Sequence, residues 1–227
     1  MSAVAPYLPY ILSGFGLTVL IAVLSIVGEL IVGVAFTALR LSPNRVLRGT
    51  GLVLVEGLRG TSEVVQMFWV FFALPLLLAV QLPPLVAAVL VLSLNGGAYA
   101  SEVMRGGLKA VPPVQREACI ALGFGPVTRM RRVIGPQALK VMLPSLANVA
   151  INTAKATSVV SLITIADLAF TVQTVRINTG QSVIAYLIAV VLYLILTAVL
   201  SLLFEAGERR LRWGTAPTRP RKQVTHA

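Results

Sequence analysis

The sequence predicts an all-α integral membrane protein with five transmembrane helices, and three observations lead to that fold class. First, 57% of the 227 residues are hydrophobic and 12% are charged, about half the charged share of an ordinary soluble domain. Second, the apolar residues fall in runs of about 20, the length that crosses a bilayer as a helix. Third, the Lys and Arg residues gather in alternate connecting segments. These features exclude a soluble enzyme, a disordered chain and a disulfide-stapled secreted module.

The first three expected spans follow from the apolar stretches in chain order. Residues 11–39 contain one charge, Glu29, and form the first span. Residues 64–81 are uncharged, and an apolar pattern reaching back toward Gly51 predicts a long second helix that is either tilted or extended into the cytoplasm. Residues 85–101, also uncharged, form the third span.

Two further stretches complete the set. Residues from about 139 to 165 enclose Lys155 and form the fourth span, and the fifth lies inside the uncharged stretch 177–204. Five spans place the two termini on opposite sides of the membrane. We expect an external N-terminal segment over residues 1–10, a transmembrane domain over 11–212 and a disordered cytoplasmic tail over 213–227.

The basic residues predict the orientation. On one side lie 16 of the 19 Lys and Arg residues, in the segments after the first, third and fifth spans. The opposite loops, 81–84 and about 164–181, hold only Arg176. The positive-inside rule therefore puts the N-terminus outside and the C-terminus in the cytoplasm. The net charge of +11 is accordingly a topology signal, and nucleic-acid binding is the poorer interpretation.

Few residues are suited to chemistry. The single cysteine, Cys119, allows no intrachain disulfide and is expected to be a small buried residue, and the single histidine, His226, is penultimate. There is no phosphate-cradling G-x-x-x-x-G-K-[ST] loop and no nucleophile–base or metal-binding constellation. We expect no catalytic residue, no metal and no cofactor in this chain.

The segment between the third and fourth spans, about residues 106–138, has its own pattern. Two prolines start a short helix over 115–122, which ends at Gly123 in the run Gly-Phe-Gly-Pro. A second, basic helix over 127–133 is expected to stop at Gly135 and the proline after it. Such helices either lie against the membrane or fit a groove on a partner.

This segment resembles the "EAA" loop of binding-protein-dependent ABC permeases. The usual pattern is E-A-A, three residues, G, nine residues, I, one residue, L-P. The spacing is intact here, with three small or apolar replacements at Cys119, Val133 and Gly135. The matching positions are Glu117, Ala118, Gly123 and Pro136.

The resemblance extends over about residues 8–212 and is to the polar amino-acid uptake permeases of the histidine/glutamine type. No single matching segment is specific to these permeases, but the set of segments together is. The segments are Leu41-Ser42-Pro43-Asn44-Arg45, Arg59-Gly60-Thr61, Val65-Gln66, Leu94-Asn95-Gly96-Gly97-Ala98-Tyr99, Arg105-Gly106-Gly107, Val111-Pro112, Pro136-Gln137-Ala138-Leu139 and Thr157-Ser158.

The resemblance implies a five-helix type I ABC importer (MetI-like) permease fold in the bacterial cytoplasmic membrane. Its implied partners are a dimer of ATP-binding subunits, a second permease subunit in a homo- or heterodimer, and an external substrate-binding protein. The implied function is ATP-driven uptake of polar amino acids or a related zwitterion of the ectoine type, with ATP hydrolysed by the partner subunits. A channel or ion-coupled carrier subunit without an ATPase is the alternative, and a non-transporting scaffold is a weaker one.

The family's loop transmits movement of the ATPase to the spans, and the residues suit that role. Glu117 can hydrogen-bond to a partner, Ala118 and Cys119 are small enough for a groove, and Gly123 permits a tight turn. Three basic residues of the second helix could pair with acids on the ATPase: Arg129, Arg131 and Arg132.

Charges inside the spans are candidate substrate contacts because they are costly in a membrane. Glu56, Arg59 and Glu63 are spaced to share one face of a continuous second helix, which either stiffens that helix or lines the path. Glu63 and Ser62 stand where the family usually has Leu and Pro, and a carboxylate there could attract an ammonium group.

Five more residues have open roles. Lys155 could face a substrate carboxylate, but Ala156 replaces the aspartate that commonly follows it in the family. Asn95 either allows a kink or touches substrate, and Glu29 is as suited to joining helices as to a site. Glu102 and Arg105 are expected to form an ion pair or gate contact.

Overall fold

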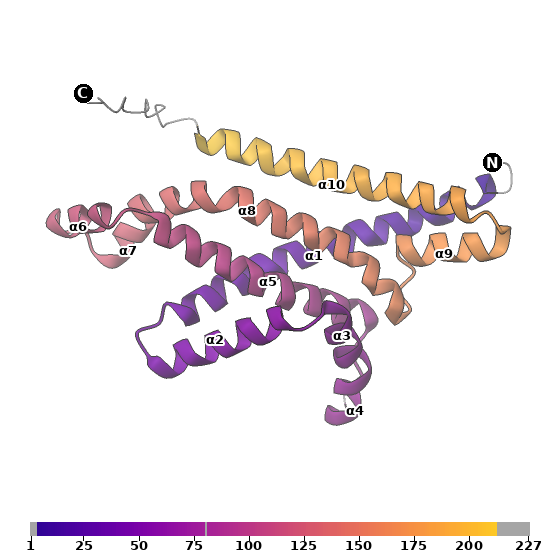
Figure 1. Ribbon diagram of the computed structural model, residues 1–227, viewed down its shortest axis with the longest axis horizontal. Coiled ribbons are helices and arrows are strands. Elements are labelled where there is room, and N and C mark those ends of the chain that lie inside the picture. Colours follow the sequence, from indigo (N-terminus) through magenta and orange to yellow (C-terminus); the bar gives the residue numbers. More distant parts are fainter. Residues whose placement is uncertain (1–3, 80, 213–227) are drawn as a thin grey trace, which may run out of the picture.

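The computed structural model describes residues 4–79 and 81–212, and every regular element among them is a helix (Figure 1). The four long helices are α1 (Leu8–Arg40), α5 (Pro84–Ala110), α8 (Gly135–Ala156) and α10 (Ser182–Arg212). The shorter α-helices are α2 (Arg45–Gly60), α3 (Glu63–Phe68), α4 (Leu74–Leu78), α6 (Pro113–Ala121), α7 (Pro126–Arg129) and α9 (Leu168–Thr179).

The expected spans are present with revised limits. Four described helices are long and apolar enough to cross a membrane, and a bent pair raises the number to five. The four are Ala5–Arg40, Pro84–Ala110, Pro126–Ile163 and Ser182–Arg210. The first begins at Ala5, near the start of the described residues, because a 3-10 turn (Ala5–Tyr7, η1) leads directly into α1.

The expectation of one continuous, long second helix is wrong. Helices α2 and α3 are separated by Thr61 and Ser62, and the pair is bent by 104°. Both residues have extended backbone angles, with ψ of 149° and 135°, so the helical hydrogen bonds cannot continue through them. Glu63 therefore does not share a helix face with Glu56 and Arg59, and the stiffened-face interpretation fails.

The expected stop at Gly135 is also wrong. A π-helical turn (Met130–Ile134, η3) joins α7 to α8, so the helix continues from Pro126 to Ile163. The N–H of Gly135 bonds to the carbonyl of Met130, and a Cβ there would lie 2.6 Å from that oxygen. The wider turn also leaves room for the ring of Pro136, which a regular α-helix would bring against an earlier carbonyl.

A short helix, α9, occupies the loop before the last span. Gly180 ends it with φ of +68°, so residues 177–179 belong to α9 and not to the fifth span. At the start of α9, Oδ1 of the buried Asp167 accepts the N–H of Phe170 at 2.9 Å. Burial raises the pKa of the Asp167 carboxyl from 3.8 to about 6. The N–H of Leu168 bonds to Thr18, which fixes α9 against α1.

Small residues allow α1 and α5 to pack closely. A Cβ added at Gly97 of α5 would lie 2.5 Å from Cγ1 of Val32 on α1. Across the same seam, Ser93 donates a 3.3 Å hydrogen bond to the carbonyl of Ser25. Small residues at such contacts let helix backbones approach in a membrane. The two helices therefore form the centre against which α2, α8 and α9 pack.

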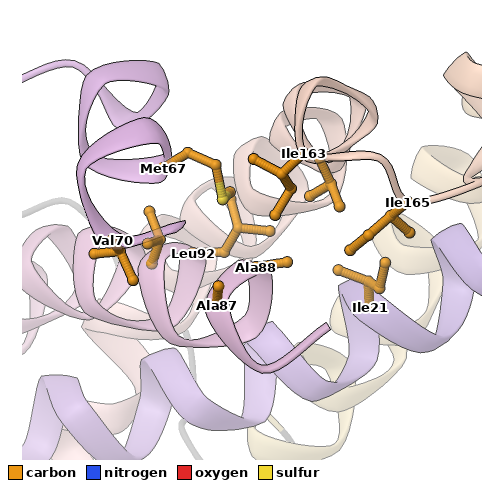
Figure 2. Close-up of a cluster of buried hydrophobic side chains, with 10 residues drawn as sticks. Ile21, Met67, Val70, Ala87, Ala88, Leu92, Ile163 and Ile165 are labelled. Atoms are coloured by element: carbon orange, nitrogen blue, oxygen red, sulfur yellow. The ribbon is translucent and has the colours of Figure 1, made fainter. Parts of the chain in front are cut away.

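A buried apolar cluster fixes the bent pair (Figure 2). Met67 and Val70, which follow the bend, pack against Leu92 of α5. Ile163 enters the same cluster from the 3-10 turn after α8 (Thr157–Ile163, η4). The bend is therefore held by tertiary packing from two other elements.

The ends of the molecule differ. Helices α6 and α7, the α1–α2 connection and the C-terminal end of α10 lie toward one end, and the N-terminus and α9 lie toward the other (Figure 1). Many basic residues lie in or beside the first group of segments, among them Arg40, Arg45, Arg116, Arg129 and Arg209. This arrangement agrees with the segregation of charge expected from the sequence.

Candidate functional site

A polar cavity of about 380 Å³ lies where the bend, α5 and α8 meet. We refer to it as the polar cavity. It is within the 300–1,000 Å³ range common for small-molecule sites, at the lower end. Its lining is mostly polar and comes from three parts of the chain: Thr61, Ser62 and Glu63; Leu92, Asn95, Gly96 and Tyr99; and Val149, Asn152 and Thr153.

Two amide side chains hold the bend that forms one wall. Nε2 of Gln66 donates to the carbonyl of Leu58 at 2.8 Å and to the hydroxyl of Thr61 at 2.6 Å. Nδ2 of Asn95 donates to the same Leu58 carbonyl at 3.1 Å and to Oε1 of Gln66 at 3.2 Å. These bonds satisfy a carbonyl freed by the end of α2. Asn95 thus both lines the cavity and positions the opposite wall.

The four candidate substrate contacts separate into two groups. Glu63 and Asn95 line the polar cavity, whereas Arg59 and Lys155 are not among its lining residues. The Arg59 guanidinium lies 5.2 Å from the ring centre of Tyr99 and ion-pairs with Glu56 at 3.5 Å. Arg59 thus approaches the cavity only through Tyr99. Lys155 is exposed, and no described carboxylate pairs with it.

Glu29 lies directly behind the cavity wall. It is fully buried, and its Oε2 accepts a 2.5 Å hydrogen bond from the hydroxyl of Thr153. A Cβ at Gly96 would lie 2.5 Å from the same oxygen, so only glycine leaves room for this carboxylate. Oε1 has no hydrogen-bond partner among the described residues. Gly96 and Thr153, the two residues close to Oε2 of Glu29, both line the cavity.

The expected Glu102–Arg105 ion pair is confirmed, with an N–O distance of 2.5 Å. Glu102 also pairs with Arg40 at the end of α1. A second acid, Glu56, lies 4.0 Å from Arg40 and so adds α2 to the network. The charges join the ends of three helices near the short helices α6 and α7.

Helix α6 forms as expected from the proline start and glycine end. Gly123 has φ of +73°, and its N–H bonds to the carbonyl of Ile120 at 2.9 Å. The N–H of Phe124 bonds to Cys119 at 2.9 Å, which completes a Schellman motif. Glu117 and Ala118 are exposed, whereas Cys119 is buried. Helix α6 therefore exposes Glu117 and Ala118 to solvent and buries Cys119 on its opposite, packed side.

The three arginines that follow are not equivalent. Arg131 and Arg132 are exposed and lie beside Val127 and Thr128, around a shallow hollow. Arg129 is half-buried and faces a different cavity, between α6 and the end of α5. Of the three, Arg131 and Arg132 are therefore the ones exposed on the outer surface.

Several cavity residues were missed from the sequence. Tyr99 follows Asn95 by four residues on α5, a spacing that places both on one helix face. The sequence predicts a substrate contact at Lys155. Asn152 and Thr153, which precede it on α8, line the cavity instead. Gln66 was noted only as part of the resemblance. Polar residues four apart in an apolar helix were the available signal.

A polar cavity between membrane helices, with a capped and exposed helix at one end, defines a membrane transport subunit. The model of the family "Binding-protein-dependent transport system inner membrane component" matches residues 29–213. The chain belongs to this family. It is a permease subunit of an ABC importer and a multi-pass inner-membrane protein. Such permease subunits work with separate ATP-binding and substrate-binding components, and the ATPase is not in the permease chain.

Named relatives agree with this assignment. The chain is 42% identical to a probable amino-acid ABC transporter permease protein, y4tF, of Sinorhizobium fredii, over 79% of this chain and 78% of the relative. It is 34% identical to the glutamine transport system permease protein GlnP of Escherichia coli, over 93% of this chain and 97% of that protein.

Solved structures share the fold. A crystal structure of an amino acid ABC transporter with histidines aligns with a TM-score of 0.83 at 30% identity, covering 91% of this chain and 96% of that chain. An inward-facing MetNI methionine ABC transporter aligns with a TM-score of 0.69 at 18% identity, over 93% and 97% of the two chains. The expected type I importer fold is thus confirmed.

Proposed function

We propose that this subunit carries polar amino acids, or a related small zwitterion, through the polar cavity. Relatives named for amino acids, glutamine, arginine and cystine support this substrate class. The observation that carries the proposal is the polar cavity itself, with Glu63 on its wall and amide and hydroxyl groups around it. A membrane path without such groups would impose a large desolvation cost on a zwitterion.

The cavity supports recognition of both ends of a zwitterion. Glu63 is its one ionisable lining residue besides Tyr99, and its carboxylate suits an ammonium or amidinium group. Asn152 and Tyr99 can donate hydrogen bonds to a carboxylate at the other end.

We propose that the N-terminus faces outward, toward a substrate-binding protein, and that the C-terminus faces the cytoplasm. The basic segments and α6 lie toward one end of the molecule, which supports this orientation (Figure 1). At the cytoplasmic end, an ATP-binding dimer would contact α6, and a second permease subunit would complete the membrane unit.

The coupling proposal uses the exposed face of α6. Glu117, Ala118 and Ala121 are exposed together with Val114, so a partner groove could accept this helix. Gly123 ends the helix, and Arg131 and Arg132 offer cations to partner acids. Cys119 is on the packing side, and its role is to hold α6 against its own chain. Different contacts with two ATPase states would supply the coupling energy.

The test is uptake by the complete transporter, reconstituted with its partner subunits and binding protein in liposomes. Labelled glutamine, arginine and ectoine serve as probes. We expect ATP-dependent uptake of at least one, and Glu63→Gln should lower it roughly tenfold, the cost of one charge-assisted contact. Glu205→Gln is the matched control, because Glu205 is an exposed acid on α10.

Two results would contradict the proposal. Uptake that proceeds without ATP would favour the channel or ion-coupled carrier. Equal uptake by the Glu63 and Glu205 variants would show that the polar cavity does not hold the solute.

A further inference from the structure

A second cavity, of about 520 Å³, lies where the ends of α1 and α5 meet α6 and α7. We call it the basic cavity. Three of its lining residues are cations: Lys109, Arg116 and Arg129. Much of the remaining lining is apolar and includes Leu41, Ile120 and Ile134. The basic cavity therefore combines an apolar lining with three positive charges.

The three cations have no acidic partner in the described chain. None of them forms an ion pair within 4.0 Å with a described carboxylate, whereas Glu56 and Glu102 pair with other arginines. Arg116 donates one 2.9 Å hydrogen bond to the carbonyl of Leu108, which turns its guanidinium toward the end of α5. Three gathered positive charges repel one another, so a negative charge from outside the chain would stabilise the arrangement.

The length of α5 would bring the basic cavity to the depth of the lipid headgroups. Helix α5 has 27 residues. At about 1.5 Å per residue it is about 40 Å long, whereas the hydrocarbon layer is about 30 Å thick. Its last turn, which carries Lys109, therefore extends into the headgroup region. The apolar residues below the cations would then face acyl chains.

We propose that the basic cavity binds an anionic glycerophospholipid. The phosphate and its anionic headgroup would lie among Lys109, Arg116 and Arg129, and the acyl chains would cover the apolar lining. Basic pockets between helices on the cytoplasmic side are suited to such headgroups. A bound lipid would brace α6 against the membrane, and this role is independent of the transported solute.

Other occupants fit less well. The C-terminal tail of the chain is basic, with Arg219, Arg221 and Lys222, and would be repelled. A partner protein on α6 would approach another face: Arg116 and Ile120 share one side of the helix, and Glu117 and Ala121 lie about 100° further round. The basic cavity is therefore on a side of α6 away from the proposed ATPase contact.

The experiment is native mass spectrometry of the assembled transporter, supplied with phosphatidylglycerol or phosphatidylcholine. The cavity variant combines Lys109→Gln, Arg116→Gln and Arg129→Gln. The control removes three exposed cations toward the same end: Arg45→Gln, Arg48→Gln and Arg210→Gln. We expect the unchanged protein and the control to retain phosphatidylglycerol in preference to phosphatidylcholine, and the cavity variant to bind it about a hundredfold more weakly.

Three outcomes would overturn the proposal. These are unchanged phosphatidylglycerol binding by the cavity variant, equal retention of phosphatidylcholine, or loss of the ATP-binding subunit with the lipid retained. The last result would make this face a protein-docking surface. If the triple variant does not assemble, Lys109→Gln alone removes one exposed cation and should weaken binding roughly fivefold. An unchanged affinity in that variant would count equally against the lipid.

Discussion

Thr153 on α8 donates a 2.5 Å hydrogen bond to Oε2 of Glu29 on α1, directly behind the wall of the polar cavity. The carboxylate is fully buried, whereas Thr153 lines the cavity. The orientation of a cavity hydroxyl therefore depends on an acid outside the lining. The bond also joins the first and fourth spans, which is the helix-joining role expected as one of two alternatives for Glu29.

Replacing Thr153 with valine should destabilise the protein by about 1–3 kcal/mol, because the nearly isosteric side chain leaves Oε2 of Glu29 without its donor. Thermal unfolding in detergent measures the effect. Thr174→Val is the control, since Thr174 is half-buried on α9 and bonds only to the carbonyl of Phe170. Equal losses in the two variants would mean that the Glu29 contact contributes no special stability.

Gly96→Ala should destabilise the protein by about 1–3 kcal/mol through overpacking. The added Cβ would lie 2.5 Å from Oε2 of Glu29 and 2.9 Å from the hydroxyl of Thr153. Adding Glu29→Ala removes one clash, so the double variant should lose less than the sum of the single losses. Gly57→Ala, in open space on α2, should be neutral or stabilising. Strict additivity would contradict the close contact.

Gly123→Val should uncouple ATP hydrolysis from uptake. At φ of +73° a β-branched residue is strained, so the turn after α6 would change and the helix would be presented differently to the ATPase. Uptake and substrate-stimulated ATPase activity are measured together in proteoliposomes. Gly125→Val is the control, because its φ of −64° suits any residue and no atom crowds it. Normal uptake and normal stimulation in the Gly123 variant would refute the coupling role.

Stability should fall as pH rises from about 4 to about 6, because of Asp167. The folded pKa of its carboxyl, about 6, is above the reference value of 3.8, so the folded state binds the proton more tightly. This favourable term is complete at low pH and is lost as the carboxyl ionises, with a limit of about 3 kcal/mol. Asp167→Asn keeps a helix-capping side chain and should remove the dependence. Identical melting-temperature profiles for both proteins would contradict this assignment.

Local signals in the sequence predicted much of the fold. Apolar runs identified the spans, and prolines with Gly123 set the limits of α6 because those residues restrict their own backbone. Gly135 and Pro136 did not end the helix, although the sequence predicted a stop there. There the π turn replaced the expected stop, since Gly135 could bond to a carbonyl five residues earlier.

The bend and the polar cavity could not be predicted from local signals in the sequence. Thr61 and Ser62 are not strong helix breakers, and the bend depends on amide bonds from Gln66 and Asn95 together with packing by Met67. The cavity joins residues from α5 and α8 that are at least 50 positions apart. Such proximity follows from the packing of helices, which no single stretch of sequence encodes.

The π turn after Arg129 gives α8 an unbroken connection to α7, and this has a mechanical consequence. The continuous helix that starts at Pro126, next to α6, also presents Thr153 to the polar cavity. Force applied at its Pro126 end would reach that cavity along one helix, with Pro144 as the natural point of flexure.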